Sequence, residues 1–248
     1  MSLIGETFGW LTDPVNWSGA AGIPIRVVEH LLVSGAALAL AIAIALPIGL
    51  AVGHTRRGAS LAVNLANLGR ALPTLALITI VLPVTAAIDP QLGFKVYPTM
   101  IALVVLGIPP ILVNTYVGIS GIEPELVESA RGMGLRERQV LRRVEIPIAL
   151  PVLAGGIRSA ATQIVATATL GAIFGGVGLG RYLVEGIAQN DNGMIFGGVT
   201  LVALVSLATE ALFAIIQRRV TSPGLAQPRF GWTSRMQPGR PAGAESRG

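Results

Sequence analysis

Residues 31–52 read LLVSGAALALAIAIALPIGLAV, a run of 22 residues without a charged side chain. The hydrocarbon core of a bilayer is about 30 Å thick, and a helix that rises about 1.5 Å per residue crosses it with about 20 apolar residues. This stretch therefore predicts a transmembrane helix. Four further apolar runs follow, at residues 61–82, 98–117, 152–174 and 194–216. Five such runs in one chain favour an all-α, polytopic membrane protein over a large soluble protein with buried helices.

The composition supports the same class of protein. The chain has 248 residues, of which 52% are hydrophobic and 12% are charged, whereas an ordinary soluble domain carries about 25% charge. So little charge argues against a disordered or nucleic-acid-coating protein, despite a sequence pI of 10.7, and we expect no nucleic-acid partner. The chain has no cysteine, which excludes a disulfide framework, a thiolate zinc site and a thiol nucleophile.

The basic residues predict how the chain is oriented in the membrane. Of 18 Lys and Arg, 13 follow the first, third and fifth spans, and three lie on the other side. Basic loops stay in the cytoplasm, so the N-terminus is expected outside and the C-terminus in the cytoplasm. We expect residues 1–26 to be an extracytoplasmic segment along the outer interface. Residues 27–220 form the transmembrane domain, and residues 221–248 are expected to be a disordered basic cytoplasmic tail.

The connection between the third and fourth spans, residues 118–150, is the most informative loop. Pro124 suits the first position of a helix, and Gly132 or Gly134 can end one, so we expect a short helix over Pro124–Gly132. A second, amphipathic and basic helix is expected over residues 135–145. Pro147 and Pro151 are then expected to break the chain before the fourth span.

This loop carries a recognisable pattern. Glu128-Ser129-Ala130, three residues, Gly134, nine residues and Val144-Glu145-Ile146-Pro147 resemble the EAA loop of ABC importer permeases. Ser129, Val144 and Ile146 depart from the general pattern, each by a small or isosteric change. Further stretches are similar to the glycine betaine/carnitine/choline subgroup, and the similarity covers about residues 27–217. These stretches are 70–77 (RALPTLAL), 114–119 (NTYVGI), 130–134 (ARGMG), 166–170 (ATATL), 175–180 (GGVGLG), 186–188 (GIA) and 190–192 (NDN).

The resemblance implies a bacterial cell-membrane protein with the transmembrane fold of type I (MetI-like) ABC importers. Its partners would be a second permease, as a homodimer or heterodimer, an ABC ATPase subunit and an extracytoplasmic solute-binding protein. Its substrate would be a compatible solute of the glycine betaine, choline, carnitine or proline type. The resemblance places the contact with the ATPase at Glu128, Ala130, Arg131, Met133, Gly134, Leu135 and Pro147.

The chain has no residues for catalysis of its own. A Walker A loop needs a Lys that reaches the phosphates, and the only lysine is Lys95, on the expected outer side. The glycine run at 175–180 is not followed by Lys and is expected to be a tight turn or gate after the fourth span. His30 and His54 have no partners at metal-ligand spacing. We therefore expect no cofactor, no metal and no enzymatic activity in this chain, with ATP hydrolysis in a separate subunit.

Polar residues inside spans are costly and usually face a bundle interior or a water path. Residues 67, 70 and 74 are expected to share one helix face, as are residues 162, 166 and 169, and Glu210 is expected to pair with one of the intramembrane arginines. For single Thr residues a helix-packing contact remains the alternative. The residues expected along the translocation path or its gate are Asn67, Arg70, Thr74, Arg158, Thr162, Gln163, Thr167, Thr169 and Glu210.

Two other interpretations remain open at this point. The solute could be a different small molecule, such as an amino acid, a phosphonate or a thiol-betaine. A quaternary ammonium ligand is normally held by aromatic rings, and only 5% of the residues are aromatic, so recognition would lie in the binding protein. Alternatively, the chain could be a non-transporting scaffold or sensor, which would not need EAA-type spacing.

Overall fold

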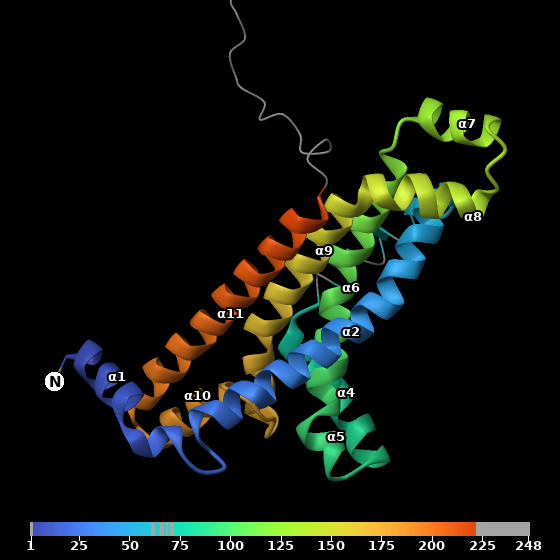
Figure 1. Ribbon diagram of the computed structural model, residues 1–248. Coiled ribbons are helices and arrows are strands. Elements are labelled where there is room, and N and C mark those ends of the chain that lie inside the picture. The colour runs from blue at the N-terminus through green and yellow to red at the C-terminus, as the bar shows by residue number, and fades with distance from the viewer. Residues whose placement is uncertain (1, 61–62, 65–66, 68, 70–71, 222–248) are drawn as a thin grey trace, which may run out of the picture.

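A computed structural model describes residues 2–60, 63–64, 67, 69 and 72–221, and these residues contain helices and no strand. Four helices among them are long and apolar enough to cross a membrane, and they run side by side as a bundle in Figure 1. The long elements are α2 (Ile23–Thr55), α6 (Tyr97–Ser120), α9 (Ile146–Thr167) and α11 (Asn192–Val220). The all-α membrane fold predicted from the apolar runs is confirmed.

Small residues bring α2 and α6 close together. Every fourth residue of α2 from Ala37 to Gly53 is alanine or glycine, and all five are buried. A Cβ atom on Gly49 would lie 2.7 Å from the Cβ atom of Thr115, and one on Gly53 would lie 2.7 Å from that of Ile119. Membrane helices associate through such small-residue stripes because lipid offers no hydrophobic driving force between them.

The second apolar run does not form one continuous span. The apolar helix α4 (Thr74–Ile88) begins after Pro73 and extends six residues beyond the predicted end at Leu82. Leu72 and Pro73 interrupt the helix, because proline has no N–H to donate and disfavours helical geometry in the preceding residue. With 15 residues, α4 is about 22 Å long, shorter than the bilayer core.

The helix that contains the predicted fourth span begins well before residue 152. Residues 137–174 form one uninterrupted helical run of 38 residues, made of α8 (Glu137–Val140), the π-helical turn η2 (Leu141–Glu145), α9 and the 3-10 segment η3 (Ala168–Phe174). The break predicted at Pro147 and Pro151 is wrong. Within η2 the Ile146 N–H bonds to the Leu141 carbonyl, five residues back, so the wide turn leads into Pro147 without a broken helix.

Short elements lie at both ends of the bundle (Figure 1). One end holds α1 (Leu3–Thr12), α5 (Leu92–Lys95) and α10 (Gly180–Gln189), and the other holds α7 (Pro124–Gly132) and α8. Helix α1 is attached to α11 through Trp10, whose ring lies against Gly197 and 4.9 Å from the ring of Tyr182. Residues 222–248, predicted to be a disordered tail, lie outside the described residues.

Candidate functional site

A helical projection lies beyond one end of the bundle and consists of α7, α8 and the turn between them (Figure 1). Helix α7 has the bounds predicted from the sequence, with Pro124 at its first position and Glu125 in its first turn. Gly134 has φ +84°, a left-handed conformation that favours glycine, and its N–H bonds to the Arg131 carbonyl at 2.9 Å. The glycine of the EAA-like pattern therefore makes the turn between α7 and α8.

The residues predicted to contact the ATPase are partly exposed and partly buried. Glu128, Arg131, Met133 and Gly134 are exposed, and Met133 has 76% of its surface accessible. Ala130, in contrast, is only 2% exposed. Ala130 and Leu135 pack with the apolar cluster beneath α7, whereas Pro147 is exposed in the first turn of α9. The side chain of Ala130 therefore helps to hold α7 in place and does not offer a surface for close approach by a partner.

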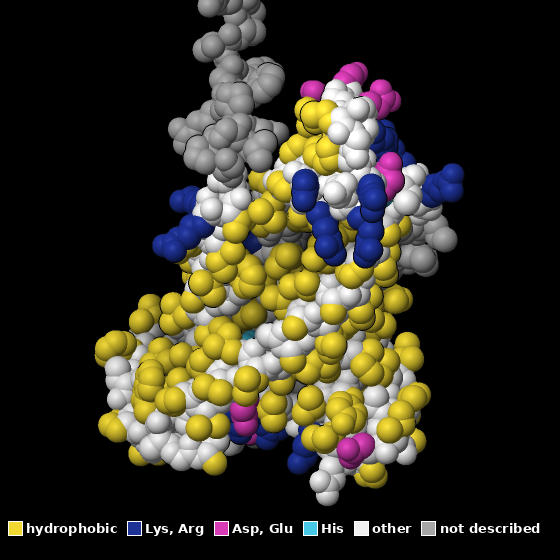
Figure 2. All heavy atoms as spheres, turned by 45° about the vertical axis from the view of Figure 1, so that its right-hand side comes forward, with side chains coloured by type: hydrophobic (Ala, Val, Ile, Leu, Met, Phe, Trp, Pro, Cys, Tyr) yellow, Lys and Arg dark blue, Asp and Glu magenta, His cyan; other side chains and the backbone are white. Residues whose placement is uncertain are grey.

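Charge is separated along the projection, as Figure 2 shows. The outermost part carries acidic side chains, and dark-blue basic side chains gather where the projection meets the apolar surface of the bundle. The acidic residues of the α7 region are Glu123, Glu125 and Glu128, and the exposed basic residues of α8 and η2 are Arg138, Arg142 and Arg143. An exposed acidic tip is suited to a basic groove on a partner protein.

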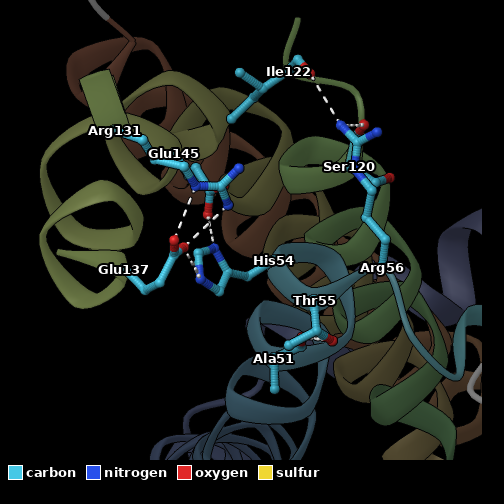
Figure 3. Close-up of polar contacts among 9 residues, drawn as sticks. All are labelled: Ala51, His54, Thr55, Arg56, Ser120, Ile122, Arg131, Glu137 and Glu145. Atoms are coloured by element: carbon cyan, nitrogen blue, oxygen red, sulfur yellow. Dashed lines mark hydrogen bonds and ion pairs between the residues drawn. The ribbon is translucent and has the colours of Figure 1, made fainter. Parts of the chain in front are cut away.

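A polar network connects the projection to α2 (Figure 3). Arg131 donates two hydrogen bonds to the Glu137 carboxylate, at 2.9 and 3.0 Å. His54, in the last turn of α2, contacts Glu137 at 3.2 Å and the buried Glu145 at 2.7 Å. The hydrogen bond to Glu137 raises the pKa of Arg131 further above its ordinary value, so Arg131 stays charged. Sequence reasoning missed this network, because His54 and Glu145 are 91 residues apart and no local spacing connects them.

A second contact holds the end of α2 against the chain that leads to α7. The Arg56 guanidinium donates to the carbonyls of Ser120 and Ile122, at 3.4 and 3.5 Å (Figure 3). Arg56 follows α2 directly, with a left-handed backbone at φ 54°. The end of α2 therefore contacts both the start of the projection and its return into α9.

Several of the polar residues predicted inside spans line one open groove between α9 and α11. Its volume is about 610 Å³, and its lining consists of Gly155, Arg158, Ser159, Thr162, Gln163, Ala166, Glu210 and Gln217. Arg158 forms an ion pair with Glu210, as expected. Thr162 donates to Glu210 at 2.9 Å, and Gln217 accepts from Arg158 at 3.1 Å. The groove therefore contains a connected polar network within an apolar bundle.

The other polar residues predicted for the path are not part of this groove. Asn67 and Thr74 do not share a helix face, because the helix is interrupted at residues 72–73, and Arg70 lies outside the described residues. Thr167 ends α9, and Thr169 lies in η3 with its hydroxyl bonded to the Ala166 carbonyl. Neither Thr167 nor Thr169 is among the residues that line the groove.

The comparisons with known proteins agree with this architecture. The family model described as "Binding-protein-dependent transport system inner membrane component" matches residues 35–222. The chain is 34% identical over 197 residues to the glycine betaine/carnitine/choline transport system permease protein OpuCB of Bacillus subtilis (strain 168), covering 79% of this chain and 88% of that protein. It is 32% identical to the osmoprotectant import permease protein OsmW of Salmonella typhimurium, covering 79% of this chain and 91% of that protein.

Solved structures show the same fold. The inward-facing MetNI methionine ABC transporter has a chain that superposes with a TM-score of 0.73 at 24% identity, covering 85% of this chain and all of that chain. A chain of an amino acid ABC transporter superposes with a TM-score of 0.63 at 15% identity, covering 79% of this chain and 93% of that chain. At these identities the likeness shows the fold alone. The family model matches three quarters of this chain, and the projection and the long apolar helices agree with that match. The chain therefore belongs to the family of binding-protein-dependent transport system inner membrane components.

Proposed function

We propose that this chain is the membrane-spanning permease subunit of an ATP-driven importer for a compatible solute of the glycine betaine, choline, carnitine or proline type. The solute class is supported by the relatives, whose names include glycine betaine/carnitine/choline and osmoprotectant transport. The role as a permease is carried by one observation. The first EAA-like residues, Glu128–Ala130, lie in the separate helix α7, and Gly134 turns the chain from α7 toward an unbroken helical run through the bundle.

That arrangement supports mechanical coupling. A run of 38 residues is about 57 Å long and extends from the base of the projection, past the polar groove, to the glycine-rich turn at residues 175–180. If an ATPase subunit holds α7 through its exposed acidic tip, closure of the ATPases moves this run as one unit. The groove around Arg158 and Glu210 then opens or closes as the bundle alternates between two access states.

The proposal includes partners and an orientation. An ABC ATPase subunit binds the projection, a second permease completes the passage across the membrane, and an extracytoplasmic solute-binding protein delivers the solute. The projection lies in the cytoplasm, as do the end of α11 and the C-terminus, and α1 lies outside. The distribution of basic residues supports this orientation, since 13 of 18 follow spans that end on the side of the projection.

The test uses the complete complex with its ATPase and binding protein, reconstituted in liposomes. We expect Glu128→Arg and Gly134→Pro to lower both solute uptake and solute-stimulated ATP hydrolysis at least about fivefold, the lower limit of typical allosteric coupling. Glu128→Arg reverses a charge at the exposed tip, and proline cannot adopt the φ of +84° found at residue 134. Both variants should still insert into the membrane.

Gly132→Ala is the matched control, because a Cβ atom there meets nothing within 4 Å and the residue is helical. Its uptake should equal that of the wild type. Uptake by wild-type liposomes that lack the ATPase subunit would contradict the proposed function. Uptake of an amino acid other than proline, with no uptake of glycine betaine, choline, carnitine or proline, would contradict the solute class alone.

A further inference from the structure

The ring of His54 lies between two carboxylates, that of Glu137 in α8 and that of Glu145 in η2, the turn that leads into α9 (Figure 3). Its Nδ1 atom is 2.7 Å from Glu145 Oε2, and its Nε2 atom is 3.2 Å from Glu137 Oε2. The His54 side chain is 15% exposed and that of Glu145 is 5% exposed. Among the described residues, His54 is the side chain that hydrogen bonds Glu145. A buried carboxylate is costly without such a partner.

The ring links the two carboxylates through its two nitrogens. Each imidazole nitrogen can take part in one hydrogen bond, and a carboxylate offers several acceptor positions. The ring faces Glu137 and Glu145 and one nearby guanidinium, Arg131, which is already bonded to Glu137.

The remaining charged groups near the end of α2 do not compete for these carboxylates. Arg56 is turned toward the carbonyls of Ser120 and Ile122, and Arg57 is exposed. Among the described residues, His54 and Arg131 are therefore the basic side chains that contact these two carboxylates.

We propose that His54 is a positioning residue that ties α2 to the projection, so that movement of α7 reaches α2 as well as α9. The inference rests on the proposed function. Apolar side chains of α2, Leu46 and Leu50, also pack beneath the projection, but apolar contacts are non-directional. The contacts of the two His54 nitrogens with Glu145 and Glu137 specify one position of α2 relative to η2 and α8. The amount of solute moved per ATP hydrolysed therefore depends on these contacts.

The experiment measures the ratio of solute moved to ATP hydrolysed in proteoliposomes that contain the whole complex. It compares the wild type, His54→Gln and His54→Arg. Glutamine is neutral, and we expect its ratio to be lower at least about fivefold, within the range of known site-to-site couplings. Arginine offers several donors to the two carboxylates, so its ratio should stay close to that of the wild type. Thr55→Ala is the control, because the Thr55 hydroxyl donates to the Ala51 carbonyl and accepts from the Arg57 N–H, and neither bond reaches the projection.

Rescue by the arginine variant separates positioning from general destabilisation. A ratio in His54→Arg as low as that in His54→Gln overturns the inference, and so does a wild-type ratio in His54→Gln. If His54→Gln does not co-purify with the ATPase, the ratio of His54→Arg relative to the wild type decides alone. Absence of ATP-dependent uptake in the wild type would instead contradict the proposed function.

Discussion

Arg158 and Glu210 show what a single pair of charges does inside an apolar bundle. Each lies on a different helix, and each is about one-third exposed to the groove between α9 and α11. Thr162 and Gln217 complete the hydrogen bonds of the pair. A charged side chain within a membrane segment is tolerated when it has such partners. The pair therefore holds α9 against α11 and lines the groove at the same time.

Reversing these charges tests whether the pair acts as a unit. Arg158→Glu and Glu210→Arg should each lower thermal stability and uptake, because each places two like charges next to one another. The double variant should recover much of both, with a coupling energy of about 1 kcal/mol or more in a double-mutant cycle of unfolding. Ser159→Ala, beside Arg158 in the groove, serves as the stability control. A double variant no better than the worse single variant would show that the two charges act separately.

At the level of elements, close packing and continuity of the helices decide the architecture. The alanine and glycine stripe of α2 allows α6 to approach, and the π-helical turn at residues 141–145 allows a helix to continue into Pro147. Both features depend on backbone geometry more than on the chemistry of side chains. The alanine and glycine stripe gives a tight α2–α6 pair. The π-helical turn gives a continuous helical connection from the projection to the bundle.

Overpacking the α2–α6 contact should destabilise the protein. Gly49→Leu places a large side chain where even a Cβ atom would lie 2.7 Å from Thr115, and overpacking costs about 1–3 kcal/mol. For a chain of this size, each 1 kcal/mol corresponds to a fall of about 2–4 °C in the midpoint of thermal unfolding. Gly35→Leu, in the same helix, should leave the midpoint nearly unchanged, because nothing lies within 4 Å of a Cβ atom there. Equal shifts in both variants would refute the packing argument.

For the whole molecule, the separation of its two ends is the main feature. The projection with its basic base and acidic tip lies at one end (Figure 2), and α1, α5 and α10 lie at the other (Figure 1). Burial at the end that holds α10 raises the pKa of Tyr182 to about 12, and the Tyr182 hydroxyl donates to the Ala21 carbonyl. The N-terminal segment is therefore attached to α10 and α11 at that end.

Cysteine labelling tests the orientation of these ends directly, since the natural chain has no cysteine. Ser129→Cys in α7 and Gln189→Cys at the end of α10 both introduce thiols at exposed positions. In intact cells, a membrane-impermeant maleimide should label residue 189 and not residue 129. After permeabilisation, in cells that produce this chain without the ATPase, both should react. Labelling of residue 129 in intact cells would invert the proposed topology.

The sequence alone determined the features that depend on local order along the chain. Apolar length specified the helices, and Pro124 and Gly134 specified the short helix α7 and the turn after it, because helix ends are decided by neighbouring residues. It also identified Arg158 and Glu210 as charges within apolar runs. It did not predict where the helices of the second and fourth apolar runs begin, because α4 begins only after Pro73 and a π-helical turn carries the other helix into Pro147.

Only the tertiary structure decided which distant residues meet. His54, Glu137 and Glu145 come together because α2 ends beside the return from the projection into α9, and no spacing in the sequence contains that information. The same holds for the inward direction of Ala130 and for the separation of Thr169 from the groove. These depend on how helices rotate and cross when they pack, and packing energies are set by contacts between residues far apart in the chain.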